Sequence, residues 1–273
     1  MAIEFKDVSF AYPNGYMANE HLNLVVGDGE TLAIVGQNGA GKTTAVKLMN
    51  GLNKPTGGDV LVDGVNTREK SCAQISRTVG YVFQNPDDQI FNSTALSEIE
   101  YMPRYLKLPE EEVRRRTDRA IELTGIGGYL KMNPLDIPYA IRKFVAIAAI
   151  IATEPKYLIL DEPTAGQDRR GNETLKRLIR ELSREGTGVI AITHDMDFVA
   201  ENFPRIVAMA HKNIIADGTA KEIFWNSQTV AESRIRKPQI AQVAEGLKLP
   251  GNILFCEELT EAMSQEKKSR AKQ

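Results

Sequence analysis

The feature that most constrains this chain is a glycine-rich segment at residues 36–44, which fits the pattern G-x-x-x-x-G-K-[ST]. It follows an apolar, β-branched run at residues 31–35, typical of a strand buried on both faces, and precedes a helix-like stretch at residues 43–52. Glycines let backbone N–H groups turn toward a phosphate without side-chain clash, and a helix N-terminus adds favourable partial charge. The segment therefore predicts a phosphate-binding loop made of Gly36, Gln37, Asn38, Gly39, Ala40, Gly41, Lys42, Thr43 and Thr44.

Two acidic residues are expected beside this loop. A second apolar run, at residues 157–160, ends in Asp161 and Glu162. The carboxyl ends of the strands form the ligand-binding edge of an α/β sheet, so both carboxylates should face the phosphates. We expect Lys42 to reach the β- and γ-phosphates and Thr43 to ligate Mg²⁺. Asp161 is suited to hold Mg²⁺ through water, and Glu162 is suited to polarise the attacking water.

The rest of the pattern indicates an α/β fold with an insertion. A third buried strand is expected at residues 188–192, and strands that alternate with helical segments favour a parallel sheet. Short strands are also expected at residues 2–5 and 8–12, before a turn at 13–15. Residues 110–116 carry three glutamates, each four positions before an arginine, which predicts a helix with three ion pairs inserted into the core.

The pattern of the core stops at about residue 220. Apolar residues at 240, 243, 244 and 247 predict an amphipathic helix that ends at Pro250 and Gly251. A second short helix is expected to carry Leu259, Ala262 and Met263. The polar, basic residues 264–273 are expected to fray.

Composition excludes several classes of protein. Lys plus Arg number 34 and Asp plus Glu number 36, so the net charge of −2 argues against a nucleic-acid binder with a broad basic surface, although a local basic groove stays open. Cys72 and Cys256 have no metal-ligand spacing, which argues against zinc and disulfides and fits a reducing compartment. Acidic residues near the start argue against a signal peptide. The longest apolar run, at residues 144–152, is much shorter than the roughly 20 residues that span a bilayer.

Three further segments complete a resemblance. Gln84 follows the run Tyr-Val-Phe, residues 163–168 read Pro-Thr-Ala-Gly-Gln-Asp, and His194 ends the run Ile-Thr-His. In order and spacing, these motifs resemble the nucleotide-binding subunit of ATP-binding cassette (ABC) transporters over residues 2–220. The resemblance implies a P-loop NTPase core in residues 1–220, with an N-terminal antiparallel β subdomain. It also implies an inserted helical subdomain at about residues 88–155 and a C-terminal helical extension at residues 221–273.

The resemblance also implies roles for individual residues, with ATP and Mg²⁺ as cofactors. Tyr12 would stack on adenine, for which its π-face is suited. Gln84 would sense Mg²⁺ and the membrane partner, and Asp168 would belong to a loop at the dimer interface. His194 would contact the γ-phosphate, where its ring can donate to a phosphoryl oxygen.

A narrower resemblance lies at residues 84–91, which read Gln-Asn-Pro-Asp-Asp-Gln-Ile-Phe. Together with the extension, this segment resembles the energy-coupling factor (ECF) branch, which includes cobalt and nickel uptake ATPases. That likeness implies a transmembrane scaffold protein, a small substrate-binding membrane protein, and a vitamin or transition-metal ion as cargo. It implies a peripheral location at the cytoplasmic face of the membrane. The alternative for the extension is a set of helices that only cover an edge of the core.

The chain departs from this family at the signature motif. Where the family has Leu-Ser-Gly-Gly-Gln, this chain has Ile137, Pro138, Tyr139, Ala140 and Ile141. In the family, the serine and glycines donate hydrogen bonds to the γ-phosphate held by the opposite subunit. Pro138 lacks both a hydroxyl and a backbone N–H, and Tyr139 places a ring where backbone should approach phosphate closely.

Because Lys42, Asp161 and Glu162 are intact, the sequence favours a heterodimer with a second ABC ATPase that supplies a complete signature. The alternatives are a homodimer that tolerates the change and a non-catalytic regulatory subunit, which Pro138 and Tyr139 favour. A soluble ABC ATPase outside transport is a further alternative. Such proteins usually carry two cassettes or long inserted arms, which this chain lacks.

Overall fold

In a computed structural model, which describes residues 2–270, the core is a six-stranded sheet in the order β10-β9-β3-β8-β7-β6. Strands β3, β6, β7, β8 and β9 run parallel, and β10 pairs antiparallel with β9 at one edge. The three strands expected at residues 31–35, 157–160 and 188–192 are confirmed. The strands are β3 (Thr31–Val35), β6 (Val79–Val82), β7 (Tyr157–Asp161), β8 (Gly188–Ile192), β9 (Arg205–Ala210) and β10 (Asn213–Gly218).

A smaller antiparallel sheet packs against one face of this core. Its order is β2-β1-β4-β5, with β1 (Ala2–Ala11), β2 (Met17–Gly27), β4 (Gly57–Val62) and β5 (Val65–Asn66). The two short strands expected at residues 2–5 and 8–12 are one strand, β1. Its pairing register shifts between Phe5 and Val8, where Asp7 has a φ of 52°, so a bulge explains the break in alternation.

Helices cover the large sheet on both faces, which explains its continuously apolar strands. In β3, Leu32 and Ile34 join the apolar cluster shared with the small sheet and α1 (Lys42–Met49), while Ala33 and Val35 face the opposite cluster. That second cluster includes residues of α6 (Arg169–Arg184) and α7 (Met196–Asn202). Helix α1 ends before the expected residue 52.

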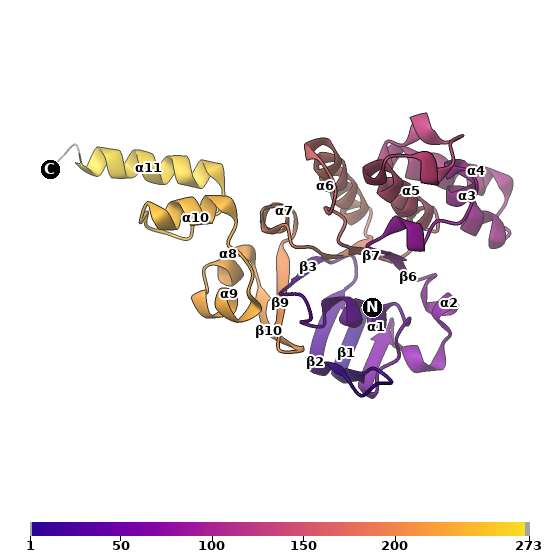
Figure 1. Cartoon of the computed structure of the whole chain (residues 1–273), viewed down its shortest axis with the longest axis horizontal. Helices are drawn as coiled ribbons and strands as arrows, with labels where there is room; N and C mark the ends of the chain where they lie inside the picture. The colour runs from indigo at the N-terminus through magenta and orange to yellow at the C-terminus, as the bar shows by residue number, and fades with distance from the viewer. Residues whose placement is uncertain (1, 271–273) are drawn as a thin grey trace.

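Between β6 and β7 the chain forms a group of helices at one end of the molecule (Figure 1). Their bounds are α3 (Ala95–Tyr105), α4 (Glu110–Thr124) and α5 (Tyr139–Ile151), and the short α2 (Cys72–Ile75) precedes β6. Helices α3, α4 and α5 lie within the segment at about residues 88–155 that was expected as an insertion.

The ion pairs of α4 differ from those expected. Glu112 pairs with Arg116 at 2.7 Å, as predicted. Glu110 instead pairs with Arg104 of α3 at 2.8 Å, and Arg115 pairs with Glu112. The prediction of three i,i+4 pairs was therefore wrong for two of them, because Arg104 of a neighbouring helix binds Glu110 and the i,i+3 neighbour Glu112 binds Arg115.

The C-terminal helices lie at the end opposite α3, α4 and α5 (Figure 1). They are α8 (Ala220–Phe224), α9 (Ser227–Ser233), α10 (Gln239–Gly246) and α11 (Cys256–Arg270). Helix α10 buries Ala241 and Ala244, whereas Val243 and Leu247 of the expected apolar face are about half exposed. Ile240 is partly buried against the cluster of Ala244, Leu249 and Ile253, so the expected face is buried only in part.

Helix α11 is longer than the short helix expected and continues through residue 270, so residues 264–270 are helical rather than frayed. Residues 271–273, the rest of that segment, lie outside the described residues. Within residues 2–270, no helix combines the length and apolar character that a membrane crossing needs. The division of the chain at residue 220 stays a prediction.

Candidate functional site

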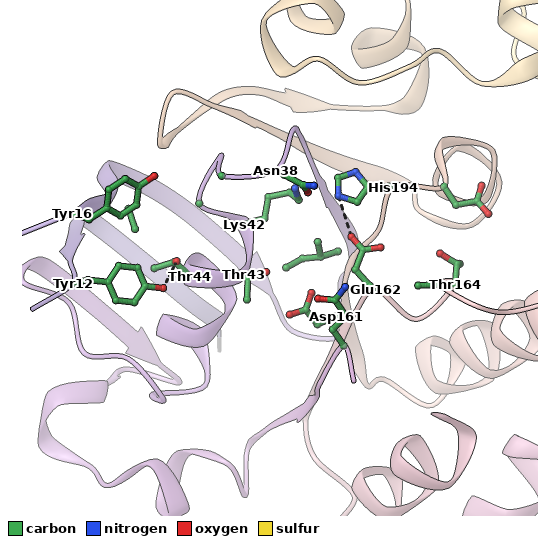
Figure 2. A pocket seen from close by; sticks show the side chains of 17 residues that line it. Tyr12, Tyr16, Asn38, Lys42, Thr43, Thr44, Asp161, Glu162, Thr164 and His194 are labelled. Atoms are coloured by element: carbon green, nitrogen blue, oxygen red, sulfur yellow. Dashed lines mark hydrogen bonds and ion pairs between the residues drawn. The ribbon is translucent and has the colours of Figure 1, made fainter. Parts of the chain in front are cut away.

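A cleft of about 700 Å³ opens between the small sheet and the carboxyl edge of the large sheet (Figure 2). This size suits a small-molecule ligand. Tyr12 and Tyr16 lie at one end, and Glu162 and His194 lie at the other. The cleft is lined by Tyr12, Tyr16, Ala18, Asn38, Gly39, Gly41, Lys42, Thr43, Thr44, Gln84, Asp161, Glu162, Thr164, Ala165, Ile192, His194 and Asp195.

The predicted phosphate loop lies between β3 and α1 and has an unusual backbone. Gly36, Gly39 and Gly41 all have positive φ, of 146°, 80° and 98°. At Gly41 a Cβ atom would collide with the side chain of Asn19 and the backbone of Ala18, so no other residue fits there. The Asn19 amide, fully buried, donates to the Gly41 carbonyl at 3.2 Å. The loop is therefore held in place from β2, a contact that the sequence pattern did not indicate.

Lys42 is buried at the base of this loop. Its Nζ donates to the carbonyls of Gly36 at 2.7 Å and Gln37 at 3.0 Å. Burial lowers the pKa of Lys42, and the carboxylates of Glu162 and Asp161 oppose that shift. The amine therefore lies in a region where a negative ligand would favour its charged form.

The carboxylate of Asp161 is buried at the end of β7 with one oxygen satisfied. Oδ2 accepts a hydrogen bond of 2.6 Å from the hydroxyl of Tyr81 on β6. Oδ1 is buried without a hydrogen-bond partner. An orphaned carboxylate oxygen in the same cleft as the Thr43 hydroxyl fits a Mg²⁺ site, because Mg²⁺ prefers few protein oxygens together with water and phosphate. Tyr81 was not expected as part of the site.

No cluster of three or more His, Cys, Asp or Glu side chains suited to a metal occurs within residues 2–270. A cage built from protein ligands alone is therefore not found in this part of the chain. The Asp161 and Thr43 pair instead suits a metal that arrives with a phosphate ligand.

Glu162 and His194 face each other across the ends of β7 and β8. The His194 Nε2 lies 3.3 Å from the Glu162 Oε1, drawn as a dashed line in Figure 2. Glu162 has a φ of 50°, a left-handed conformation that is rare for a residue with a side chain. Burial raises the pKa of Glu162 and lowers that of His194, so the site favours the uncharged form of each side chain.

Two tyrosines form the opposite end of the cleft. The Tyr12 hydroxyl lies 3.1 Å from the Thr44 Oγ1, and its ring stacks with Tyr16 at a centroid distance of 6.4 Å. Both rings are exposed. Tyr16 was missed from the sequence, although its place just after the turn at residues 13–15 was a usable signal.

Several predicted residues lie outside the cleft lining. Gly36 and Gln37 contribute carbonyls to Lys42, and Ala40 is buried. Asp168 caps helix α6, where its Oδ1 accepts from the Gly171 N–H at 2.7 Å. Gln84 does line the cleft. The predicted roles of all these residues stay predictions.

The segment at residues 137–141 begins helix α5. Ile137 is buried, and Pro138 occupies the N-cap position, whose carbonyl accepts from the N–H groups of Ile141 and Arg142, both at 2.9 Å. Proline is tolerated there because the first N–H groups of a helix have no intrahelical partner. The Tyr139 ring packs against Gly166, and its hydroxyl donates a long hydrogen bond of 3.5 Å to the Gln84 carbonyl.

Comparison with known proteins places this geometry in a family. Residues 19–165 match the ABC transporter family. An ABC transporter ATP-binding protein of Pyrococcus furiosus is 43% identical over 90% of this chain and 94% of its own length. The energy-coupling factor transporter ATP-binding protein EcfA of Methanocaldococcus jannaschii is 38% identical over 92% of this chain and 91% of its own length.

A solved structure gives the same result. CbiO1 of Clostridium perfringens, described as part of the ABC transporter complex CbiONQ, superimposes with a TM-score of 0.77 and 31% identity. The match covers 90% of this chain and 98% of that chain. The fold, the cleft and these relatives agree that the chain belongs to the ABC transporter family of ATP-binding proteins, which are ATPases coupled to transport.

Proposed function

We propose that this chain is the ATP-hydrolysing subunit of an ECF-type importer that takes up a vitamin or a transition-metal ion. One observation carries the proposal: a single cleft unites the phosphate loop with Asp161 and Glu162 at the end of β7 and with His194, which follows β8 and faces Glu162. The likeness to EcfA and CbiO1 supports the ECF branch.

The cleft suits in-line attack of water on the γ-phosphate of ATP. Tyr12 and Tyr16 offer aromatic faces to adenine, while the N–H groups of the loop and Lys42 bind the phosphates. Mg²⁺, when bound with ATP near Asp161, Thr43 and Gln84, supplies charge that offsets the negative charge of the transition state. Glu162 polarises the attacking water, and His194 donates a ring N–H toward a phosphoryl oxygen.

Replacement of Tyr12 by Ala is expected to weaken ATP binding about 5- to 150-fold, because base–aromatic stacking contributes about 1–3 kcal/mol. Tyr12→Phe keeps the ring and loses only the contact with Thr44, so it should stay within a few-fold of the native protein. Equilibrium titration with a fluorescent ATP analogue measures both. Equal affinities for the native and Tyr12→Ala chains would remove Tyr12 from the adenine site.

We propose that the competent site needs a second ABC ATPase with an intact signature, because the Tyr139 ring packs on its own chain and Pro138 has no donor to offer. The partner's signature would complete the cleft described above. A transmembrane scaffold protein and a small substrate-binding membrane protein would complete the transporter. The chain would then act at the cytoplasmic face of the membrane.

The test is Mg-ATP hydrolysis by the purified chain alone, at high protein concentration. The chain alone lacks two charge-assisted hydrogen bonds that an intact signature would donate to the γ-phosphate. At about 1.5–3 kcal/mol each, their loss should reduce turnover about 10²- to 10⁴-fold relative to the assembled transporter. ATP binding should persist. Turnover by the chain alone at the rate of the assembled transporter would favour a working homodimer. A transporter whose turnover survives loss of Glu162 would instead favour a regulatory subunit.

A further inference from the structure

A lysine is buried inside the apolar helix α5. Lys143 is only 3% exposed, and the residues that follow it, Phe144, Val145, Ala146 and Ile147, are buried and apolar. Burial of an ammonium group is unfavourable unless its donors find acceptors. The position therefore requires specific partners, and these partners indicate what Lys143 does.

Lys143 donates to two backbone carbonyls in the segment that follows β7. Its Nζ donates to the carbonyl of Glu162 at 2.6 Å and to the carbonyl of Ala165 at 2.9 Å. This short segment carries the Glu162 side chain into the cleft. One side chain of α5 thus holds both ends of the segment that presents the proposed base.

The backbone of Glu162 needs such support. Its left-handed φ of 50° is unfavourable for a residue with a Cβ, and such conformations persist only where surrounding contacts determine them. Its N–H donates to the Ile192 carbonyl at 2.8 Å, and its carbonyl accepts from the Ala165 N–H at 3.3 Å as well as from Lys143. Of these three bonds, only the one from Lys143 is made by a side chain.

The altered signature adds to this arrangement. The Lys143 Nζ lies 5.7 Å from the centroid of the Tyr139 ring, within range of a cation–π interaction. A glycine at position 139 would offer no such ring. The Gln167 Nε2 also donates to the Ala140 carbonyl at 3.0 Å. The start of α5 therefore contacts the segment 162–167 through Tyr139, Ala140 and Lys143.

We propose that Lys143 is a positioning residue for ATP hydrolysis, whose ammonium group fixes the backbone of Glu162 so that the carboxylate faces the attacking water. The inference rests on the proposed role of Glu162. It makes the geometry of the base depend on where α5 sits, so a displacement of the helices between β6 and β7 would change the rate of the chemical step.

The test compares Lys143→Met and Lys143→Arg in the assembled transporter. Lys143→Met keeps the apolar chain and loses both hydrogen bonds, so we expect kcat to fall about 10- to 100-fold with KM for ATP within twofold of native. Lys143→Arg keeps the donors and should recover most of kcat. Lys176→Met, which breaks a surface ion pair between Lys176 of α6 and Glu201 of α7, is the matched control and should retain native turnover.

A double-mutant cycle separates positioning from general stability. If Lys143 acts through Glu162, Lys143→Met should change turnover less than twofold in a Glu162→Gln background. An equal loss of kcat in both backgrounds, or a loss that follows only a lower melting temperature, would overturn the inference. Native kcat in Lys143→Met while Glu162→Gln is inactive would also overturn it and leave the proposed function standing. Native turnover in Glu162→Gln would refute the proposed function itself.

Discussion

Glu162→Gln in this chain is expected to lower kcat of the assembled transporter about 10²- to 10⁴-fold, the usual contribution of a general base. That loss corresponds to about 2.7–5.4 kcal/mol of transition-state stabilisation. The amide keeps the size of the side chain and its place opposite His194, so KM for ATP should stay within a few-fold of native. Steady-state phosphate release at saturating Mg-ATP measures the change.

The control for this substitution is Glu111→Gln. Glu111 is exposed in the first turn of α4, remote from the cleft lining, and its loss should leave kcat unchanged. The assignment of the competent site to this chain is wrong if Glu162→Gln hydrolyses ATP at the native rate. In that outcome the partner's own catalytic residues would carry the turnover.

A restored signature is expected to let the chain hydrolyse ATP by itself. The variant Pro138→Ser, Tyr139→Gly, Ala140→Gly, Ile141→Gln regains a hydroxyl, a backbone N–H and close access to phosphate, while buried Ile137 is kept. We expect at least about a hundredfold gain in turnover over the native chain alone, the lower end of what two charge-assisted hydrogen bonds provide. The measurement is Mg-ATP hydrolysis by each purified chain.

A mixing experiment shows which subunit provides the catalytic base and which provides the signature. The restored variant that also carries Glu162→Gln offers a signature but has no base of its own. Added to the native chain, it should produce turnover, because one of the two sites in each mixed dimer would join native Glu162 with a restored signature. A melting curve of each variant checks that the loss of the Tyr139 contacts leaves the chain folded. A folded mixture without activity would refute the complementary arrangement.

Much of this cleft could be predicted from sequence, because its chemistry depends on local spacing. The glycine-rich segment after a buried strand predicts a strand–loop–helix unit. The apolar run before Asp161 predicts where the next strand of the site ends. Parallel pairing then brings both to one sheet edge. The continuous apolar runs identified the buried strands, because helices or a second sheet cover both faces.

The errors and omissions arise where contacts are not local. Asn19 and Lys143 are far in sequence from the loops that they hold, and a single buried polar residue carries no spacing signal. In α10 the apolar period is present, but tertiary packing buries the small residues and leaves Val243 and Leu247 outward. Competition from Arg104 on a neighbouring helix redirects the ion pairs of α4 in the same way.

The walls of the cleft belong to two different sheets, with Tyr12 and Tyr16 beside the antiparallel sheet and Glu162 and His194 at the edge of the parallel one (Figure 2). A bound nucleotide therefore acts as a non-covalent cross-link between two layers, in addition to the apolar packing around α1 and polar contacts such as the hydrogen bond from Arg205 of β9 to the Val25 carbonyl of β2. Ligand at a hundred times its dissociation constant adds about 2.7 kcal/mol to the folded state. Through that linkage the cellular ATP concentration would set how firmly the two sheets are held together, as well as the rate of turnover.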